Sequence, residues 1–489
     1  MPRASDSRFD FVLGLNTTHS PDVMDAREVR YARNGRLTTY GAVSKRAGTK
    51  RITSDTMGAF RVFGIAQWDN PSATGEIVAI CDADLWYKTL AGTTWTNVAS
   101  TLSTANMVSF APYKTGGTNR LYFADGALRK WTATTLTTSI TGAPAARFLR
   151  VYGERMFATN NTSTIFWSKI NDPETWTAPD GGQANVETYD SEPIVGLEVI
   201  GSSLLLFKQN SIARFTGTTA ATIEVRKETE GISPEVGCIA PMTICRVDDF
   251  VFFLSDRGPY ICNESGVQPI GLKIEKDMED WNKAHWSKSV AVFNPLRREV
   301  WLFVPGEGKT VNDTGYCYNV RSQSWTGPWD FGTTFDVAAA CRFEDANGIE
   351  GVLLGGNDGI VRDGDFGDDD GGAIDDVRSD GSLGTNVTLE VEYPPLMFGD
   401  PGSVKMLQGT QYVHADLRTN GSLTLTLTGD ERATASTRTI ASAGAGVKSY
   451  RYQGAWRGRR PTLRVKDATA DVVTITGIQT EAVVGRRVV

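Results

Sequence analysis

The residues that could do chemistry are few, and the densest group is a run of aspartates. Asp363, Asp365, Asp368 and Asp370 place four carboxylates within eight residues. Ca²⁺ favours several oxygen ligands on a flexible loop, but the EF-hand register is absent, because the sixth position is not glycine and the twelfth is not glutamate. The favoured interpretation is a solvated acidic turn, with a calcium site at these four residues as the alternative.

Histidine and cysteine offer little more. Only three histidines occur, His19, His285 and His414, which removes most routes to histidine-based acid/base or metal chemistry. The six cysteines include no C-x-x-C pair, whereas zinc and redox sites need two sulfurs close together. The sequence therefore predicts free thiols buried in strands and no bound cofactor apart from the possible Ca²⁺.

The stretch IFWSKINDPETW (residues 165–176) raises the question of glycoside chemistry. Ser168 and Thr175-Trp176 resemble the ends of the S-x-D-x-G-x-T-W box of sialidase-type propellers, a structural box even there. Asn171-Asp172-Pro173 fills its middle, and the glycine is missing. Those enzymes also need three arginines that clamp a carboxylate and a Tyr/Glu pair, and no spacing here identifies such a set. We predict no catalysis, and we favour packing over sugar stacking as the role of the tryptophans.

The elements that would position these residues follow a repeat. Short apolar runs bounded by polar turns begin 44, 35, 48, 47, 49 and 52 residues apart, at Ile77, Leu121, Met156, Leu204, Val251, Val300 and Val352. Seven units of this length match the blade spacing of a β-propeller. The runs are continuous rather than alternating, as expected of strands packed between neighbouring blades.

Each run has neighbours that fit a four-stranded blade. An alternating strand precedes it, a third strand follows it, and an outer strand comes last, opened in three units by Trp95, Trp176 or Trp325. We expect these tryptophans to serve packing and hairpin closure. Only residues 271–285 suggest a helix, which would dock on the propeller through Ile274, Met278 and Trp281.

The expected organisation is all-β: a propeller of roughly seven units with an N-terminal arm and a C-terminal antiparallel, sandwich-like β-domain. We place the arm and first strands at 1–58, the propeller at 59–362, an acidic glycine-rich linker at 363–383 and the C-terminal domain at 384–489. The arm has two possible roles, either to complete the propeller or to reach a neighbouring subunit.

Charge and hydropathy limit the possible partners. The chain carries −7 in total, with 13 Lys+Arg against 9 Asp+Glu from residue 384 onward and 37 against 48 before it. A body this acidic should repel nucleic acid rather than wrap it. We find no apolar run of 18 residues and no secretory signal pattern, so we expect no membrane span and synthesis in the cytoplasm.

The N-terminal residues resemble the opening of phage tail-hub and packaged-DNA-stabilisation proteins. The matches are Gly14-Leu15-Asn16, Pro21, Asp25-Ala26, Asn34-Gly35-Arg36-Leu37 and Arg46-Ala47-Gly48, among which Gly35 and Gly48 are expected at structural turns. The segments RMFATNNTSTIFWSKINDPETW, FVFFLSDRGPYICNESGVQPIG and EVWLFVPGEGKTVNDTGYCYNVRSQSWTGPW are similar to successive blades of that group. The end, from WRGRRPTLRV to the final Gly485-Arg486-Arg487, is similar to its closing β-domain.

This resemblance implies a structural virion protein of a short-tailed bacteriophage, assembled in the host cytoplasm. It would form a tail nozzle or hub ring, commonly of six copies, beside portal, adaptor and other tail proteins. The ring would close the particle and let genomic DNA pass during ejection. The alternative is a carbohydrate-binding or receptor-binding propeller, such as a phage adhesion protein or a lectin.

Overall fold

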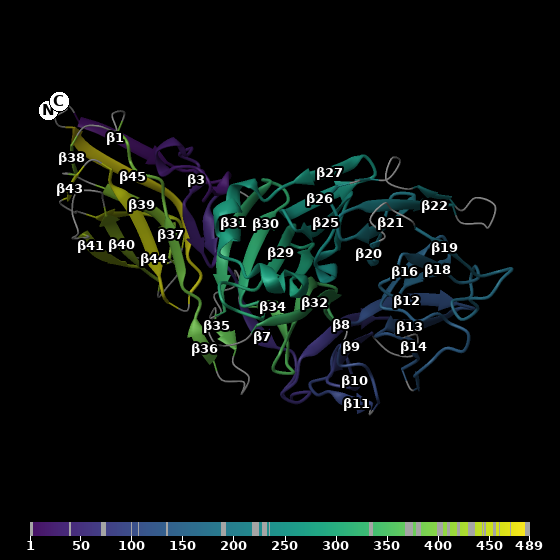
Figure 1. Ribbon diagram of the computed structural model, residues 1–489. Helices are drawn as coiled ribbons and strands as arrows, with labels where there is room; N and C mark the ends of the chain where they lie inside the picture. Colours follow the sequence, from purple (N-terminus) through teal and green to yellow (C-terminus); the bar gives the residue numbers. More distant parts are fainter. Residues whose placement is uncertain are drawn as a thin grey trace.

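The computed structural model consists of a β-propeller and a β-sandwich that lie side by side, with both chain ends at the far end of the sandwich (Figure 1). It describes the whole chain except residues 1–2, 39–40, 70–74, 99, 106, 134, 187–191, 218–223, 227–231, 234, 332–335, 367–374, 378–382, 399–403, 408–410, 418–420, 429–435, 443, 445, 453–455, 459, 470 and 485–489. None of the described helices is long and apolar enough to cross a membrane.

The propeller has seven blades within the described residues, of which six are antiparallel four-stranded sheets and the seventh belongs to a six-stranded sheet, and this confirms the predicted all-β propeller class. Blades 1 to 3 comprise β8 (Val62–Trp68), β9 (Glu76–Cys81), β10 (Asp84–Thr89), β11 (Thr96–Val98); β12 (Ser109–Thr115), β13 (Thr118–Ala124), β14 (Leu128–Trp131), β15 (Leu136–Thr137); and β16 (Phe148–Tyr152), β17 (Arg155–Thr159), β18 (Thr164–Trp167), β19 (Gly182–Asn185).

Blades 4 to 6 continue the same order outward from the axis. They comprise β20 (Ile194–Ile200), β21 (Ser203–Lys208), β22 (Ile212–Thr216), β23 (Glu224–Arg226); β24 (Cys245–Val247), β25 (Phe250–Ser255), β26 (Gly258–Asn263), β27 (Gly266–Pro269); and β28 (Val290–Asn294), β29 (Glu299–Val304), β30 (Thr314–Asn319), β31 (Ser324–Asp330). Short 3₁₀ turns occur at η1 (Pro21–Val23) and η2 (Pro241–Thr243).

The second strand of each blade is the apolar run that the sequence predicted. All six residues of β9, β21 and β29 are buried. In β9, Val78 and Ile80 pack against blade 2, whereas Ile77 and Ala79 pack on the other face in a cluster that includes Leu353 of blade 7. Because successive side chains of a strand point to opposite faces, a strand between two blades needs apolar residues at every position.

The seventh blade is completed by the N-terminal segment. Its strands β32 (Val337–Glu344), β33 (Glu350–Gly356) and β34 (Val361–Phe366) are followed by β7 (Gly48–Arg51), which pairs antiparallel with β34. Residues 48–51 thus join a blade whose other strands lie about three hundred residues later. The first of the two predicted roles for the N-terminal arm, completion of the propeller, is confirmed.

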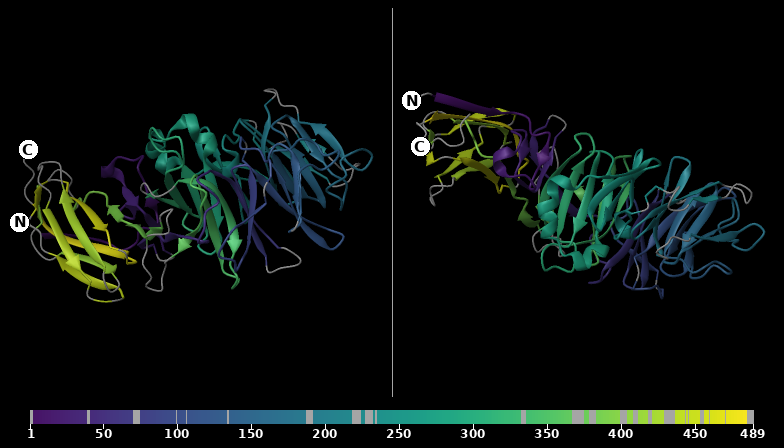
Figure 2. Two further views of the ribbon diagram at one scale, coloured as in Figure 1. Left: turned by 90° about the horizontal axis from the view of Figure 1, so that it is seen from below. Right: turned by 45° about the horizontal axis from the view of Figure 1, so that its top comes forward.

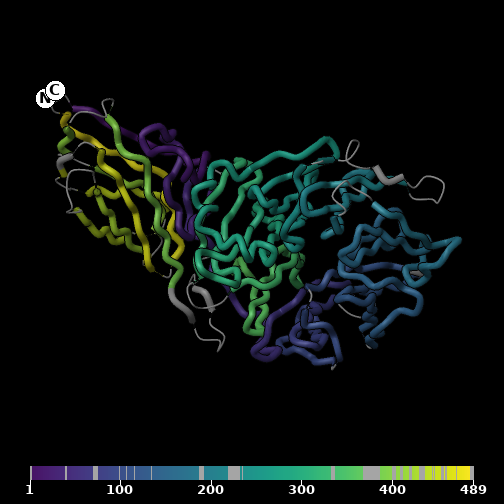
Figure 3. The backbone as a smooth tube through the Cα atoms, viewed as in Figure 1, coloured from purple at the N-terminus to yellow at the C-terminus, as the bar shows by residue number. Residues whose placement is uncertain are grey.

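Most of the remaining N-terminal strands enter the sandwich, whereas two short ones form a separate two-stranded sheet (Figure 3). β4 (Tyr31–Arg33) pairs with β37 (Leu389–Glu392) in a five-stranded sheet, and β1 (Arg3–Arg8) and β6 (Val43–Lys45) pair with β45 (Thr474–Val484) in an eight-stranded sheet. The short β2 (Gly14–Leu15) and β3 (Glu28–Val29) pair in parallel, and β5 (Gly35–Leu37) pairs with β6. The sandwich is therefore built from both ends of the chain.

The other sandwich strands come from the C-terminal part of the sequence. They are β38 (Lys405–Leu407), β39 (Gln411–Asp416), β40 (Ser422–Thr428), β41 (Ser436–Ala441), β42 (Lys448–Tyr452), β43 (Trp456–Gly458) and β44 (Thr462–Asp467). Leu423, Leu425 and Leu427 alternate into one core with Phe11 and Val43 of the N-terminal segment. The period-two pattern thus marks the face of β40 that packs inward.

An ion pair lies inside this sandwich. The Lys45 ammonium contacts Asp467, both side chains have no exposed surface, and the Lys45 Nζ also donates to the carbonyl of Thr469 at 2.6 Å. The hydroxyl of Thr469 donates to the other Asp467 oxygen at 2.8 Å. Lys45 lies in β6 and Asp467 ends β44, so the pair links the N-terminal and C-terminal parts of the sandwich.

Three local expectations differ from the structure. The helix predicted over 271–285 is broken into η3 (Leu272–Ile274), α1 (Glu275–Glu279) and η4 (Lys283–Lys288), although Ile274, Met278 and Trp281 are buried against the propeller as expected. No side chain caps α1, and Trp281 and Trp286 pack edge to face at 5.6 Å. Tertiary packing of the two rings therefore decides the backbone path over the helical pattern.

Trp176 does not open an outer strand. It lies in the connection between β18 and β19, where its ring is buried with residues of blades 2 and 3 and its Nε1 donates to the carbonyl of Pro173 at 2.9 Å. The predicted linker also differs, because its first four residues belong to β34, and β35 (Asp375–Val377) and β36 (Leu383–Asn386) extend that sheet. Pairing with β7 and β33 gives those linker residues a strand conformation that their acidic composition did not indicate.

We expect Trp176→Ala to lower the free energy of unfolding by about 3–5 kcal/mol, because the ring is buried between two blades. Phe60→Ala serves as the control, since that ring is 52% exposed and should change stability by less than about 0.5 kcal/mol. Urea unfolding followed by far-UV circular dichroism measures both. Equal stability of the two variants would contradict the packing role.

Lys45→Met should destabilise the protein by about 3–5 kcal/mol, because it leaves the Asp467 carboxylate buried without its cation. The double variant Lys45→Met/Asp467→Asn should recover part of that loss, since the uncompensated charge is then gone. A double-mutant cycle from urea unfolding tests this. A double variant as unstable as the sum of the two single ones would show that the pair does not couple the two ends.

Candidate functional site

The predicted packing residues lie at blade boundaries. Trp325 is buried within β31, where its Nε1 donates to the carbonyl of Ile270 at 2.6 Å and its ring lies 5.0 Å from that of Tyr318. Trp95 precedes β11, and its backbone N–H donates to the Asp55 carboxylate at 2.9 Å. Together with Trp176, these side chains lie inside the protein rather than on a surface where a sugar could stack.

The two predicted glycines lie where the propeller meets the sandwich. Gly35 begins β5, and a Cβ there would come within 3.0 Å of the Ala32 carbonyl, so the turn leaves little room for a larger residue. The Gly35 carbonyl also accepts a hydrogen bond from Trp329 Nε1 at 2.8 Å. Gly48 begins β7, the strand that closes the seventh blade.

The four aspartates proposed for Ca²⁺ are only partly described. Asp363 and Asp365 lie on β34, whereas Asp368 and Asp370 fall outside the described residues. The Asp365 carboxylate accepts hydrogen bonds from Arg297 Nε at 2.6 Å and Asn294 Nδ2 at 3.1 Å. In the described part of the chain, no group of three or more His, Cys, Asp or Glu is placed to hold a metal. The calcium site stays a prediction.

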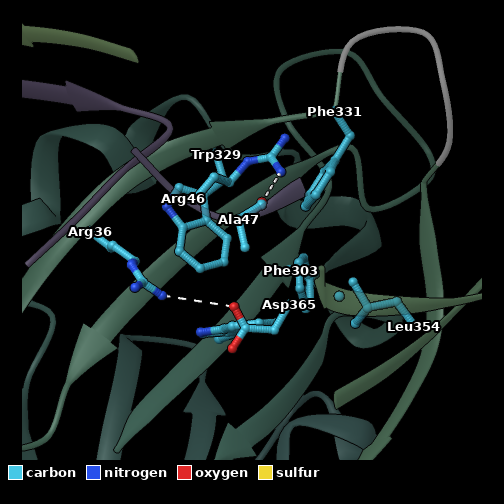
Figure 4. Close-up of a pocket in the computed structure, with 10 residues that line it drawn as sticks. Arg36, Arg46, Ala47, Phe303, Trp329, Phe331, Leu354 and Asp365 are labelled. Carbon is cyan, nitrogen blue, oxygen red and sulfur yellow. Dashed lines mark hydrogen bonds and ion pairs between the residues drawn. The ribbon is translucent and has the colours of Figure 1, made fainter. Parts of the chain in front are cut away.

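A polar cluster lies at the junction of propeller and sandwich (Figure 4). The guanidinium of Arg46 lies 4.5 Å above the ring of Phe331, and its Nε donates to Asn34 Oδ1 at 3.0 Å. Asn34 is in turn held by the backbone of blade 6, because its N–H donates to the Pro328 carbonyl and its side chain accepts from the Asp330 N–H. The β4–β5 turn is thereby fixed to β31.

Buried charges reinforce this junction. Arg36 of the sandwich contacts Asp365 of blade 7 at 3.8 Å, and both side chains are about nine-tenths buried. Burial raises the pKa of the nearby Glu299 carboxyl, which accepts a hydrogen bond from Trp301 Nε1 at 3.1 Å. A cavity lined by Arg36, Trp301 and Asp365, among others, encloses about 10 Å³, which is enough for roughly one water molecule. Around this small cavity the junction is a packed contact that joins the two bodies, and two larger open cavities lie elsewhere along it, one beside Tyr31 and Trp281 and one beside Thr38 and Arg297.

One of the open cavities of the described structure lies on the propeller axis. It encloses about 370 Å³ and is lined by residues of β8, β12, β16, β20, β24, β28 and β32, the inner strands of all seven blades. Most of the lining is apolar or aromatic, including Phe110, Phe148 and Phe293. We call this cavity the axial channel. Its volume falls in the range of small-molecule sites in proteins.

Four charged residues line the axial channel. Arg150 of blade 3 and Glu198 of blade 4 form an ion pair at 2.8 Å, and the charge of Glu198 raises the pKa of Arg150. Arg246 lies on blade 5 and Arg342 on blade 7, and the Arg342 guanidinium lies 5.7 Å over the ring of Phe293 on blade 6. Arg342 also contacts Glu350 at 3.1 Å, where both side chains are about half exposed.

Two thiols complete the polar lining. Cys245 and Cys341 are free and partly exposed, whereas the other four cysteines are free and buried. Burial raises the pKa of Cys341 to about 12 and that of Cys245 higher still, so both thiols are neutral at physiological pH. The described lining itself has three arginines against one glutamate, which is a positive excess in a chain whose total charge is −7, and Arg342 is paired in addition with Glu350 outside the lining.

The sequence did not lead us to predict that arginines of different blades meet in the axial channel. Arg246 and Arg342 each follow a cysteine, and each pairs with the first residue of its blade's apolar run, Val251 and Val352. A Cys-Arg dipeptide repeated before two runs was the available signal. Glycosidases use a pair of carboxyl groups or, in sialidases, a tyrosine nucleophile. The described lining of the channel has one carboxylate and no tyrosine, so its chemistry fits anion binding.

The carboxyl of Asp363, which lies on β34 beside the closing strand β7, makes the stability of the protein depend on pH. Burial raises the pKa of its carboxyl to about 6, aided by the charge of Asp365 and opposed by a hydrogen bond from the Asp365 N–H. Its register partner is Lys50 of β7. Because the folded pKa exceeds the unfolded value of about 3.9, its contribution to stability is full below about pH 4 and is lost as pH rises through about 6.

We therefore expect the stability difference between the parent protein and Asp363→Asn to fall as pH rises from 4 to 7. The control is Asp345→Asn, since backbone N–H groups, led by that of Ile349, lower the pKa of exposed Asp345, which titrates below this window. Urea unfolding at four pH values measures both differences. A pH-independent difference for Asp363→Asn would contradict the buried state of this carboxyl.

Comparison with known proteins supplies a relationship for the propeller. Residues 83–280 match the phage-stabilisation family model, described as bacteriophage P22 Gp10, β-propeller. No curated protein matches the chain.

Three of the solved structures that resemble the chain share little sequence with it. The mitotic checkpoint complex is 11% identical, with a TM-score of 0.43 over 68% of this chain and 94% of that chain. Sqt1 of Saccharomyces cerevisiae is 13% identical, with a TM-score of 0.40 over 66% of this chain and 100% of that chain. The extracellular domain of the one-component system BT4673 from B. thetaiotaomicron is 10% identical, with a TM-score of 0.43 over 88% of this chain and 62% of that chain.

The observed blades define the propeller fold, and the family match relates part of this propeller to phage stabilisation proteins. The matched residues run from the β9–β10 turn of blade 1 to the segment after blade 5. The predicted resemblance to phage tail-hub and stabilisation proteins is confirmed over that segment, which is less than half of the chain.

Proposed function

We propose that this chain is a subunit of the tail nozzle or hub ring of a short-tailed bacteriophage, which closes the portal channel and conducts DNA during ejection. The observation that carries the proposal is the match of residues 83–280 to the propeller of the P22 Gp10 family. Portal, adaptor and other tail proteins would be its neighbours in the virion, and assembly would take place in the host cytoplasm.

The size of the axial channel supports a ring of several chains. The channel encloses about 370 Å³, which is the volume of a small-molecule site. B-DNA is far larger, since its major groove alone is about 12 Å wide. A duplex therefore has no path through one propeller, and a conduit for DNA requires a lumen between copies. Closed rotational symmetry is the usual way in which identical chains enclose such a lumen.

The charge of the chain is compatible with sliding DNA. Residues before 384 carry 37 Lys+Arg against 48 Asp+Glu. Phosphate contacts from Lys and Arg supply most of non-specific DNA affinity, so an acidic wall would hold the duplex weakly. The tight propeller–sandwich junction supports the same role, because a conduit under pressure needs subunits that keep their shape.

Light scattering after size-exclusion chromatography tests this function. We expect the purified chain to elute as a closed ring, alone or after addition of its adaptor protein, with a mass that does not grow with concentration. The proposal fails if the chain stays monomeric with the adaptor present. Binding of such a monomer to a glycan array would instead support the carbohydrate-binding alternative.

A further inference from the structure

The axial channel has a feature that a ring subunit does not need. Three consecutive blades contribute Arg246, Phe293 and Arg342 to its lining. The aromatic ring lies on the middle blade of the three, and the two arginines lie on the blades next to it. The three inner strands concerned, β24, β28 and β32, are spatial neighbours. This arrangement offers positive charge and an apolar face in the same half of the cavity.

The opposite half is electrically balanced. Arg150 and Glu198 are paired there at 2.8 Å, beside the apolar side chains of Phe110 and Phe148. Glu198 also accepts the backbone N–H of Val199 at 3.0 Å, so its carboxylate is already engaged. A cation would find no uncommitted carboxylate among the described lining residues, whereas an anion would meet Arg246 and Arg342.

The arginines keep hydrogen-bonding capacity for a ligand. Arg246 donates through Nε to the Asp248 carbonyl at 3.4 Å, and Arg342 donates through one Nη to Glu350 at 3.1 Å. Each guanidinium has five N–H donors, and its planar fork matches carboxylate and phosphate groups. Both side chains are exposed to the channel, so they can reorient without unfolding a blade.

We propose that the axial channel binds a small organic anion, a carboxylate or phosphate with an apolar body, through Arg246 and Arg342, with the apolar body against Phe293. The 370 Å³ volume admits a small molecule and excludes a folded chain or a duplex. This site is separate from the ring function, because no step of DNA passage uses it.

Isothermal titration of the full chain with phenyl phosphate tests the site. We expect saturable binding of one molecule per chain that weakens as salt concentration rises. Phenol, which lacks the charge, should bind at least about tenfold more weakly, because it forms no charge-assisted hydrogen bonds. Absence of saturable binding by phenyl phosphate would overturn the proposal.

Arg246→Ala and Arg342→Ala should each weaken binding about tenfold, and the double variant should abolish it. Arg321→Ala is the matched control, because Arg321 is exposed on the same propeller but does not line the channel. If a variant fails to fold, Arg246→Lys/Arg342→Lys takes its place and should bind with intermediate affinity, since lysine keeps the charge but loses the fork. Undiminished binding by the double variant, or equal loss in Arg321→Ala, would overturn the proposal.

Discussion

Pairing of β7 with β34 is the interaction on which the rest of the structure depends. The second strand of each blade is buried only if a neighbouring blade covers each of its two faces. For blades 1 and 7 this requires that the propeller ring is closed. The closing strand comes from residues 48–51, so folding must bring the two ends of the propeller sequence together. The cost of such closure grows only slowly with loop length, which makes a long-range seal feasible.

The same segment ties the sandwich to the propeller. Before residue 48 the chain supplies β1, β4, β5 and β6 to the sandwich. After β34 it adds β35 and β36 to the sheet of blade 7 and then returns to the sandwich with β37. Figure 2 shows the sandwich beside the blade 6 and 7 side of the propeller in two further views. Contacts from Asn34, Arg36 and Arg46 to blades 6 and 7 fill the interface. A change of angle between the two bodies would therefore break buried hydrogen bonds and ion pairs.

The sequence was informative wherever burial alone dictated residue type. Both-faced burial produced the continuous runs at β9, β21 and β29, and one-faced burial produced the alternation in β40, so blade number and sandwich class could be predicted. Long-range pairing left no local pattern. The partner of Lys45 lies 422 residues away, and β7 reads as a short polar strand on its own. Likewise the channel arginines lie on different blades, and only ring closure brings them to one axis.

Hydrogen exchange of the full chain tests the central claim, that the N-terminal strand seals the propeller, most directly. Amides of Gly48–Arg51 should exchange as slowly as those of β33 in the same blade, because opening the seal exposes the blades on both sides of it. Rapid exchange of residues 48–51, at the rate of exposed loops and with β33 still protected, would contradict it. In that case the propeller would be stable without its N-terminal strand.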